Sequence, residues 1–162
     1  MGLSQLDVGF INVFLQSVES TFNKAFHCEV TRGQVRVGKT QSPEYEIAVI
    51  TGVLGRDHTG VIGYSMKEMT AKRLIDYLDP TFNSANESQD AFCEGLGEII
   101  NIISGNSMTF FSKNEISLDI TTPSVVTGDS FKLFFLNQTT LFSDMLTPFG
   151  MMEISIAIKK LK

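Results

Sequence analysis

Apolar residues recur at three- and four-residue steps near the start of the chain, a spacing that predicts an amphipathic helix. The stripe consists of Leu6, Phe10, Val13, Phe14, Val18, Thr21 and Phe22. Ser4 followed by Asp7 resembles a capping box, so we expect the helix to begin there. Its polar face lacks the lysines and arginines of a membrane-surface helix, which indicates that the stripe faces a protein core.

Runs of β-branched and apolar residues predict strands farther along the chain. Residues 29–37 form the first run, and residues 45–54 are almost continuously apolar, as is typical of a central strand. Residues 55–60 predict a turn, and residues 61–64 a short returning strand. Segments 117–122, 131–136 and 151–159 predict further strands, with residues 125–129 as a loop. The last strand has one apolar face, so we expect it to extend a sheet across a two-fold axis in a homodimer.

Two more helices are expected between these strands. Ser65, with Glu68 three residues later, predicts the cap of a helix that ends at Asp79 and Pro80. Another helix is expected from residue 86 or 88 to about residue 113. Strands interrupted by helices and joined by direct hairpins predict an α+β fold, with a largely antiparallel sheet packed against long helices. The length of 162 residues fits a single domain, 1–162.

Composition and charge narrow the functional classes. With 43% hydrophobic and 19% charged residues the chain is typical of a globular protein. A net charge of −5 argues against nucleic-acid partners, which require a basic surface. We find neither a secretory signal nor an apolar run long enough to span a membrane, so we expect a cytoplasmic protein. His27 and His58 lack the neighbours of a catalytic or metal site, and His58 is expected in an exposed turn.

The longest predicted helix carries an unusual combination of residues on one face. Four of them follow one another at steps of four, three and four: Glu94, Glu98, Asn101 and Gly105. Polar residues alone are typical of a solvated helix face. Each glycine of this helix lowers the stability of the helix by about 0.5–1 kcal/mol relative to alanine. They are Gly95, Gly97 and Gly105. They favour a second interpretation, in which another surface approaches the helix backbone closely.

Glu98 and Asn101, separated by two isoleucines, resemble the Glu-x-x-Asn signature of the CheC/CheX chemotaxis phosphatases. The Thr-rich segment that ends at Pro123 is similar to a Pro-containing strand and loop of that family, and the hairpin at 49–65 also fits. The single motif is like that of CheX-type members. Two features depart from the family pattern: Glu94 replaces Asp or Ser, and the interval from Asn101 to Pro123 is slightly short.

The resemblance implies hydrolysis of the aspartyl phosphate on a CheY-like response-regulator receiver. Asn101 would orient the attacking water, and Glu98 would pair with a lysine of the receiver. The implied partner-binding residues are Glu94, Gly97, Gly105 and Pro123. The receiver would bring its own Mg²⁺, so no cofactor or metal is expected on this chain, and family members also form homodimers. Glu94 motivates an alternative, a non-catalytic adaptor that binds a receiver or another signalling protein through the same helix face.

Overall fold

The computed structural model describes residues 8–41, 43–136 and 139–161. Within these ranges the helical elements are α1 (Val8–Ser20), the π-helical turn η2 (Thr21–Ala25), α2 (Glu68–Leu78) and α3 (Gln89–Lys113). The strands are β1 (Thr31–Gly38), β2 (Tyr45–Gly55), β3 (His58–Met66), β4 (Leu118–Ile120), β5 (Ser124–Phe131), β6 (Thr140–Thr147) and β7 (Gly150–Lys160). The proposed cap of the first helix at Ser4 and Asp7 lies outside the described residues.

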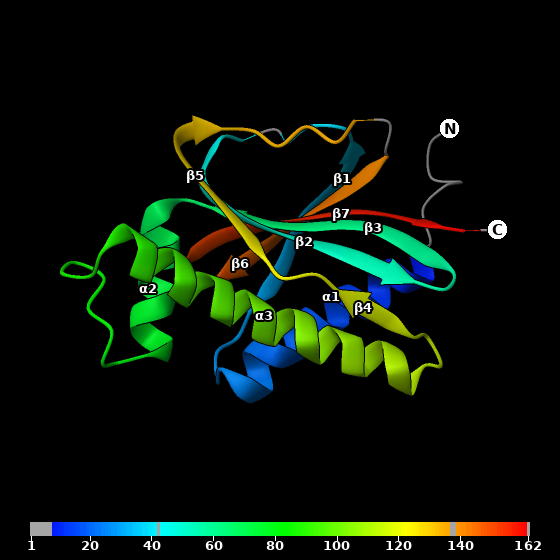
Figure 1. Cartoon of the computed structure of the whole chain (residues 1–162), viewed down its shortest axis with the longest axis horizontal. Coiled ribbons are helices and arrows are strands. Elements are labelled where there is room, and N and C mark those ends of the chain that lie inside the picture. Colours follow the sequence, from blue (N-terminus) through cyan, green and yellow to red (C-terminus); the bar gives the residue numbers. More distant parts are fainter. Residues whose placement is uncertain (1–7, 42, 137–138, 162) are drawn as a thin grey trace.

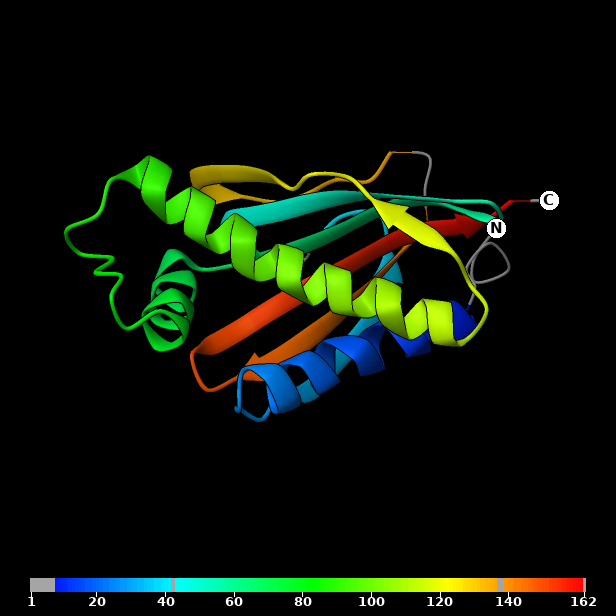
Figure 2. The same cartoon turned by 60° about the horizontal axis from the view of Figure 1, so that its bottom comes forward.

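The strands form one antiparallel sheet in the order β1-β6-β7-β3-β2-β4, with β5 pairing beside β4 on the outer edge of β2. Figures 1 and 2 show the helices on one face of this sheet, with α1 and α3 running side by side across it. The apolar core lies between these two layers. The predicted α+β class, a largely antiparallel sheet packed against long helices, is confirmed.

The two long helices also meet through polar groups. The hydroxyls of Ser17 on α1 and Ser107 on α3 share a buried hydrogen bond of 2.6 Å. One turn away, Asn106 donates to the hydroxyl of Thr21 at 3.3 Å. The buried Ser17–Ser107 pair is directional, unlike an apolar contact, so it fixes how α3 is rotated about its axis on α1, whereas the longer Asn106 contact lies at the partly exposed margin. This rotation decides which residues of α3 face solvent.

Two of the predicted strands differ from the structure. Residues 125–129 form most of β5 and are not a loop, because this polar segment pairs with the exposed edge of β2. The strand predicted at 131–136 is instead irregular after Phe131, with one isolated bridge from Phe134 to Thr40. β6 was not predicted. Residues on both faces of this strand are buried. Such a strand lacks the simple apolar and polar alternation that reveals one-sided strands.

The expected place of the last strand at a sheet edge is wrong. β7 pairs with β3 along one side and with β6 along the other, so it has no open edge for a second subunit. Its polar alternate positions are misleading, because Glu153 and Ser155 are buried on the sheet face that the helices leave free. A homodimer stays a prediction, and it would have to use a surface other than this strand.

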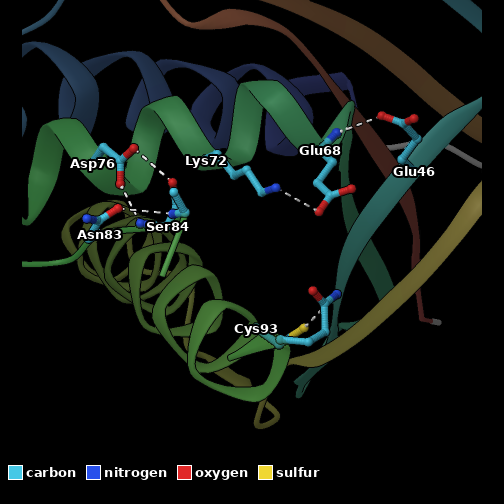
Figure 3. Close-up of polar contacts among 9 residues, drawn as sticks. Glu46, Glu68, Lys72, Asp76, Asn83, Ser84 and Cys93 are labelled. Carbon is cyan, nitrogen blue, oxygen red and sulfur yellow. Dashed lines mark hydrogen bonds and ion pairs between the residues drawn. The ribbon is translucent and has the colours of Figure 1, made fainter. Parts of the chain in front are cut away.

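The beginning of α2 differs from the prediction as well. Ser65 lies inside β3, where its hydroxyl accepts a hydrogen bond from Gln41, so it does not cap the helix. The helix begins at Glu68, whose backbone N–H donates to the Glu46 carboxylate at 2.9 Å (Figure 3). A carboxylate at a helix N-terminus satisfies an unpaired backbone donor and complements the helix dipole.

His58 is buried, contrary to the expected exposed turn. It is the first residue of β3, it is 5% exposed, and its ring stacks on Phe10 at 4.7 Å between centroids. The turn before it is shorter than predicted, because β2 continues to Gly55.

The sheet face opposite the helices has a cover of its own. Residues 39–41 and 133–135 run antiparallel and are joined by hydrogen bonds from Gln41 N to Leu133 O and from Phe135 N to Lys39 O. Figure 1 shows these segments, cyan and gold-orange, on the side of the sheet away from α1 and α3. We call them the cover. The cover leaves the helix side free to carry a functional surface and encloses polar side chains of β6 and β7.

Candidate functional site

The candidate site is built on α3, whose ends are well defined. Ser88 caps the helix by accepting a hydrogen bond from Ala91 N at 3.1 Å. Just before it, the connection from α2 is fixed by Asp76, which accepts from the hydroxyl and the backbone N–H of Ser84 (Figure 3). These contacts set the position at which α3 begins, and therefore the position of every side chain along it.

The predicted separation of two faces on α3 is confirmed. Its apolar side is buried in the core through Phe92, Leu96, Ile99, Ile100, Ile103 and Phe111. Glu94, Glu98, Asn101 and Gly105 are all exposed on the opposite side. Because the core contacts and the serine pair with α1 hold the helix firmly, Glu98 and Asn101 stand on a rigid ridge. Rigid support of this kind suits groups that must be placed accurately in a partner.

An open groove runs along this ridge. It has a volume of about 710 Å³ and lies between α3 and the segment that joins β4 to β5. The α3 wall includes Glu94, Gly97, Glu98 and Asn101, and the opposite wall is formed by Ile120, Thr121, Thr122, Pro123 and Val125. The structure thus brings five of the six predicted site residues together around one groove. Gly105 continues the exposed stripe one turn beyond it.

The opposite wall is held against the sheet by Thr121. Its hydroxyl accepts a hydrogen bond from Gly52 N at 2.8 Å, and its own N–H donates to Gly52 O at 3.0 Å. On either side of this contact, Ile120 pairs with Val53 and Ser124 pairs with Ile50. Pro123 is therefore part of a firmly attached segment that faces α3.

The three glycines of α3 play different parts. A methyl group on Gly97 would meet only Val125, at 4.0 Å, and one on Gly105 would meet nothing within 4 Å. Because these two positions carry no side chain, another surface can approach the helix backbone closely there, as expected. A methyl group on Gly95 would meet Ile75 of α2 and Phe82 of the following connection at 3.8–4.0 Å, so this glycine lies where the groove meets the packing of α3 on α2.

The groove contains features that the sequence analysis missed. Thr121 and Thr122 are part of its far wall. Next to the groove, but not among its lining residues, the apolar Ile102 is 48% exposed directly after Asn101. Ile102 interrupts the polar face at the position four residues after Glu98, which was a signal available in the sequence. A single exposed isoleucine is common on protein surfaces, so it is the position of Ile102 next to Asn101 that makes it a candidate contact for a partner.

Cys93 also lines the groove, but it is poorly suited to nucleophilic chemistry. Burial, followed by the nearby carboxylates of Asp90 and Glu68, raises the pKa of its thiol. A thiol that stays protonated at neutral pH is a weak nucleophile. No histidine is among the described residues of the groove lining. The chemistry available here is positioning by a carboxylate and an amide.

Comparison with known proteins places this arrangement in a family. The family model described as Chemotaxis phosphatase CheX matches residues 47–143, which is more than half of the chain and includes α3 and Pro123. The chain belongs to the CheX family of chemotaxis phosphatases, as the resemblance of its sequence predicted. No match was found among curated protein sequences.

Solved structures with a similar fold are distant in sequence. A CheC-like superfamily protein from Shewanella sp. PV-4 is 18% identical, with a TM-score of 0.82 and coverage of 95% of this chain and 99% of that chain. Chemotaxis protein CheX from Vibrio vulnificus is also 18% identical, with a TM-score of 0.79 and coverage of 93% and 99%. A CheX–CheY–BeF₃–Mg²⁺ complex from Borrelia burgdorferi is 21% identical, with a TM-score of 0.64 and coverage of 93% and 97%. At these identities the likeness shows the fold alone.

Two further findings concern membrane spans and metal sites among the described residues. None of their helices is both long and apolar enough to cross a membrane. Nowhere in the described part of the chain do three or more His, Cys, Asp or Glu side chains gather in a way that would hold a metal ion.

Proposed function

We propose that this protein hydrolyses the aspartyl phosphate of a CheY-like receiver domain, using Glu98 and Asn101 as groups inserted into the active site of the receiver. The observation that carries the proposal is the exposure of both side chains on one rigid ridge beside an open groove. Family membership supports the reaction class. The Borrelia burgdorferi structure, in which a CheX protein is bound to CheY, supports the class of partner.

In this reaction a water molecule attacks the phosphorus atom, and the bond between phosphorus and the aspartyl oxygen breaks. The products are inorganic phosphate and the free carboxylate of the receiver. An acyl phosphate is already reactive, so the helper protein needs only to place the water in line. The receiver contributes the phosphoryl group, its bound Mg²⁺ and a lysine.

The Asn101 amide is suited to orienting the water, because it both donates and accepts hydrogen bonds and does not titrate. Glu98 lies one turn earlier on the same face, and its carboxylate would pair with the receiver's lysine. That pair would set how deeply the ridge is inserted. An acceleration of about 100-fold corresponds to about 2.7 kcal/mol, which one well-placed amide can supply.

The groove would receive the rim of the receiver's active site. Gly97 and Gly105 allow close approach to the helix, while Glu94 and Pro123 would contact the receiver from the two walls. Glu94, which stands where the family has Asp or Ser, lies on the groove wall one turn before Glu98. It would therefore act on binding and leave the water position unchanged.

The test measures phosphate loss from a phosphorylated receiver of the same genome, with and without this protein. We expect the wild type to accelerate the loss and Asn101→Ala to abolish most of the acceleration. Asn106→Ala is the matched control, because Asn106 is an exposed asparagine of α3 that contacts Thr21 of η2 instead of the groove. It should retain activity.

The outcomes separate the competing functions. If the protein binds receivers without shortening the phosphate lifetime of any of them, it is an adaptor and the enzyme proposal is wrong. If Asn101→Ala keeps full activity, the reaction stands but the role of the amide is refuted. Glu98→Gln distinguishes the second role, since it should raise KM for the receiver more than Glu29→Gln, an exposed substitution outside the groove.

A further inference from the structure

A second cavity lies on the other face of the sheet, away from α3. It has a volume of about 360 Å³ and is lined by Gln34 and Arg36 of β1, Pro43, Asp144 of β6 and Glu153 of β7. The cover and the tight strand pairing leave Glu153 only 1% exposed, in the middle of the sheet. The groove proposed for the receiver shares none of these residues. The cavity is thus a separate place in the fold.

Opposite charges line this cavity without contacting one another. Asp144 and Glu153 are direct partners in the β6–β7 register, so their carboxylates lie on the same face. The Arg36 guanidinium stacks over the Phe142 ring, with its Cζ atom 4.3 Å from the ring centroid. Within the described residues neither carboxylate forms an ion pair with it. The guanidinium and the two carboxylates therefore face the same space from different sides.

Buried polar atoms in this space have unfilled hydrogen-bonding capacity. The Oε1 atom of Glu153 and the Nη2 atom of Arg36 are buried and have no hydrogen-bond partner among the described residues. Within the same part of the chain, the Tyr45 hydroxyl also forms no hydrogen bond of good geometry, although it lies close enough to Glu153 to lower the pKa of that carboxyl. An unpaired buried charge is costly, so such groups are normally paired, hydrated or bound to a ligand. Of the two charged groups, Glu153 Oε1 accepts hydrogen bonds and Arg36 Nη2 donates them.

These features restrict what could fill the cavity. A metal ion is disfavoured, because a guanidinium forms part of the wall. A simple anion would meet two carboxylates, and a simple cation would meet Arg36. Water can complete hydrogen bonds, but it brings no charge to balance either the carboxylates or the guanidinium, so the carboxyls beside water tend to stay protonated. A molecule that carries a positive and a negative group a few bonds apart meets every requirement.

We propose that this cavity binds a small zwitterion of the amino-acid type, with its ammonium group on Glu153 and Asp144 and its carboxylate on Arg36. Gln34 would add an amide contact at the rim. Burial raises the pKa of both Glu153 and Asp144. For Glu153, Gln41, Arg36 and Tyr45 offset this effect only in part, and for Asp144 the offset comes from Arg36. An ammonium group between them would favour the ionised carboxylates, so occupancy should release protons.

The test follows backbone amide NMR signals of the full chain during titration with each of the twenty standard amino acids separately. We expect saturable shifts at Arg36, Asp144 and Glu153 with at least one of them. Ethylamine and propionate carry one half of the charge pair each, and they should bind at least tenfold more weakly. Failure of all twenty amino acids to saturate these signals would overturn the proposal, leaving a water-filled cavity. Equal binding of ethylamine or propionate would also overturn it.

Variants assign the two ends of the ligand. Glu153→Gln and Arg36→Met should each weaken amino-acid binding at least tenfold. Glu153→Gln removes a buried charge and keeps the side-chain shape, so the variant should fold and show a dispersed spectrum. Arg73→Met, on the exposed surface of α2, is the control for loss of an arginine and should bind as the wild type does. Unchanged binding in both cavity variants would refute the assignment.

Discussion

Thr121 and Gly52 exchange two hydrogen bonds, one from Gly52 N to the Thr121 hydroxyl at 2.8 Å and one from Thr121 N to Gly52 O at 3.0 Å. A methyl group on Gly52 would approach the Thr121 Cγ2 atom to 2.9 Å, which is closer than real contacts allow. The absence of a side chain at 52 and the hydroxyl at 121 are therefore complementary. Together they hold the wall that carries Pro123 opposite Asn101.

Thr121→Val should impair the proposed phosphatase while the fold persists. Valine keeps the shape of threonine but leaves Gly52 N without its acceptor, at an expected cost of about 0.5–1.5 kcal/mol in unfolding free energy. Because the freed wall would shift relative to Asn101, we expect activity to fall severalfold. Urea denaturation and the receiver assay measure the two effects. Thr109→Val is a suitable comparison, since the hydroxyl of this exposed threonine donates to Gly105 O of its own helix and Thr109 is not among the residues lining the groove. Equal activity of both variants would show that the wall does not matter.

Gly97 and Gly105 should respond differently to larger side chains. Gly105→Ala fills open space in a helix interior and should stabilise the protein by about 0.5–1 kcal/mol. Gly97→Leu would place a bulky group inside the groove, so we expect loss of receiver binding with an intact circular dichroism spectrum. Gly105→Leu shows how far the docking surface extends. If it binds receivers normally, the contact ends before that residue.

The helices were predicted from the sequence, apart from the start of α2, because their signals are local. The 25 residues of α3 were predicted almost to their ends, since Ser88 and the apolar stripe are read directly from the chain. The strands were harder. β6 and β7 are buried on both faces, and the second face is covered by residues 39–41 and 133–135, which are distant in sequence. No local pattern reveals such a cover, so the last strand was predicted with one apolar face, although Glu153 on its other face is also buried.

The site was predicted in the same uneven way. Glu98 and Asn101 share a helix, so their common face follows from the spacing alone. The far wall depends on a hydrogen bond between Gly52 and Thr121, 69 residues apart, and sequence spacing cannot supply it. Gly95 and Gly97 both line the groove, but helix glycines look alike in sequence and only the structure shows their different surroundings. Gly95 lies near Ile75 and Phe82, whereas Gly97 has only Val125 within 4 Å.

Ile102→Ser should weaken receiver binding without changing the chemical step. Ile102 is 48% exposed beside Asn101, so its loss should change stability by no more than about 0.5 kcal/mol. If the receiver covers this side chain equally in the ground and transition states, KM rises and kcat stays constant. Steady-state hydrolysis over a range of receiver concentrations measures both. Leu146→Ser, a 50% exposed residue of β6, serves as control. A fall in kcat with unchanged KM would mean that Ile102 helps to position Asn101.

Glu153 should make the protein less stable as the pH rises. Burial raises the folded-state pKa of this carboxyl above its unfolded value of 4.5, and the nearby Gln41, Arg36 and Tyr45 offset the effect only in part. Between the two pKa values the folded protein binds more protons than the unfolded chain, so the free energy of unfolding falls as pH increases through this window. The penalty is absent below the unfolded pKa and fully present above the folded one. Urea denaturation from pH 4 to pH 8 should therefore show that Glu153→Gln gains stability over the wild type toward neutral pH. A constant difference between the two proteins across this range would show that Glu153 ionises normally in the folded state.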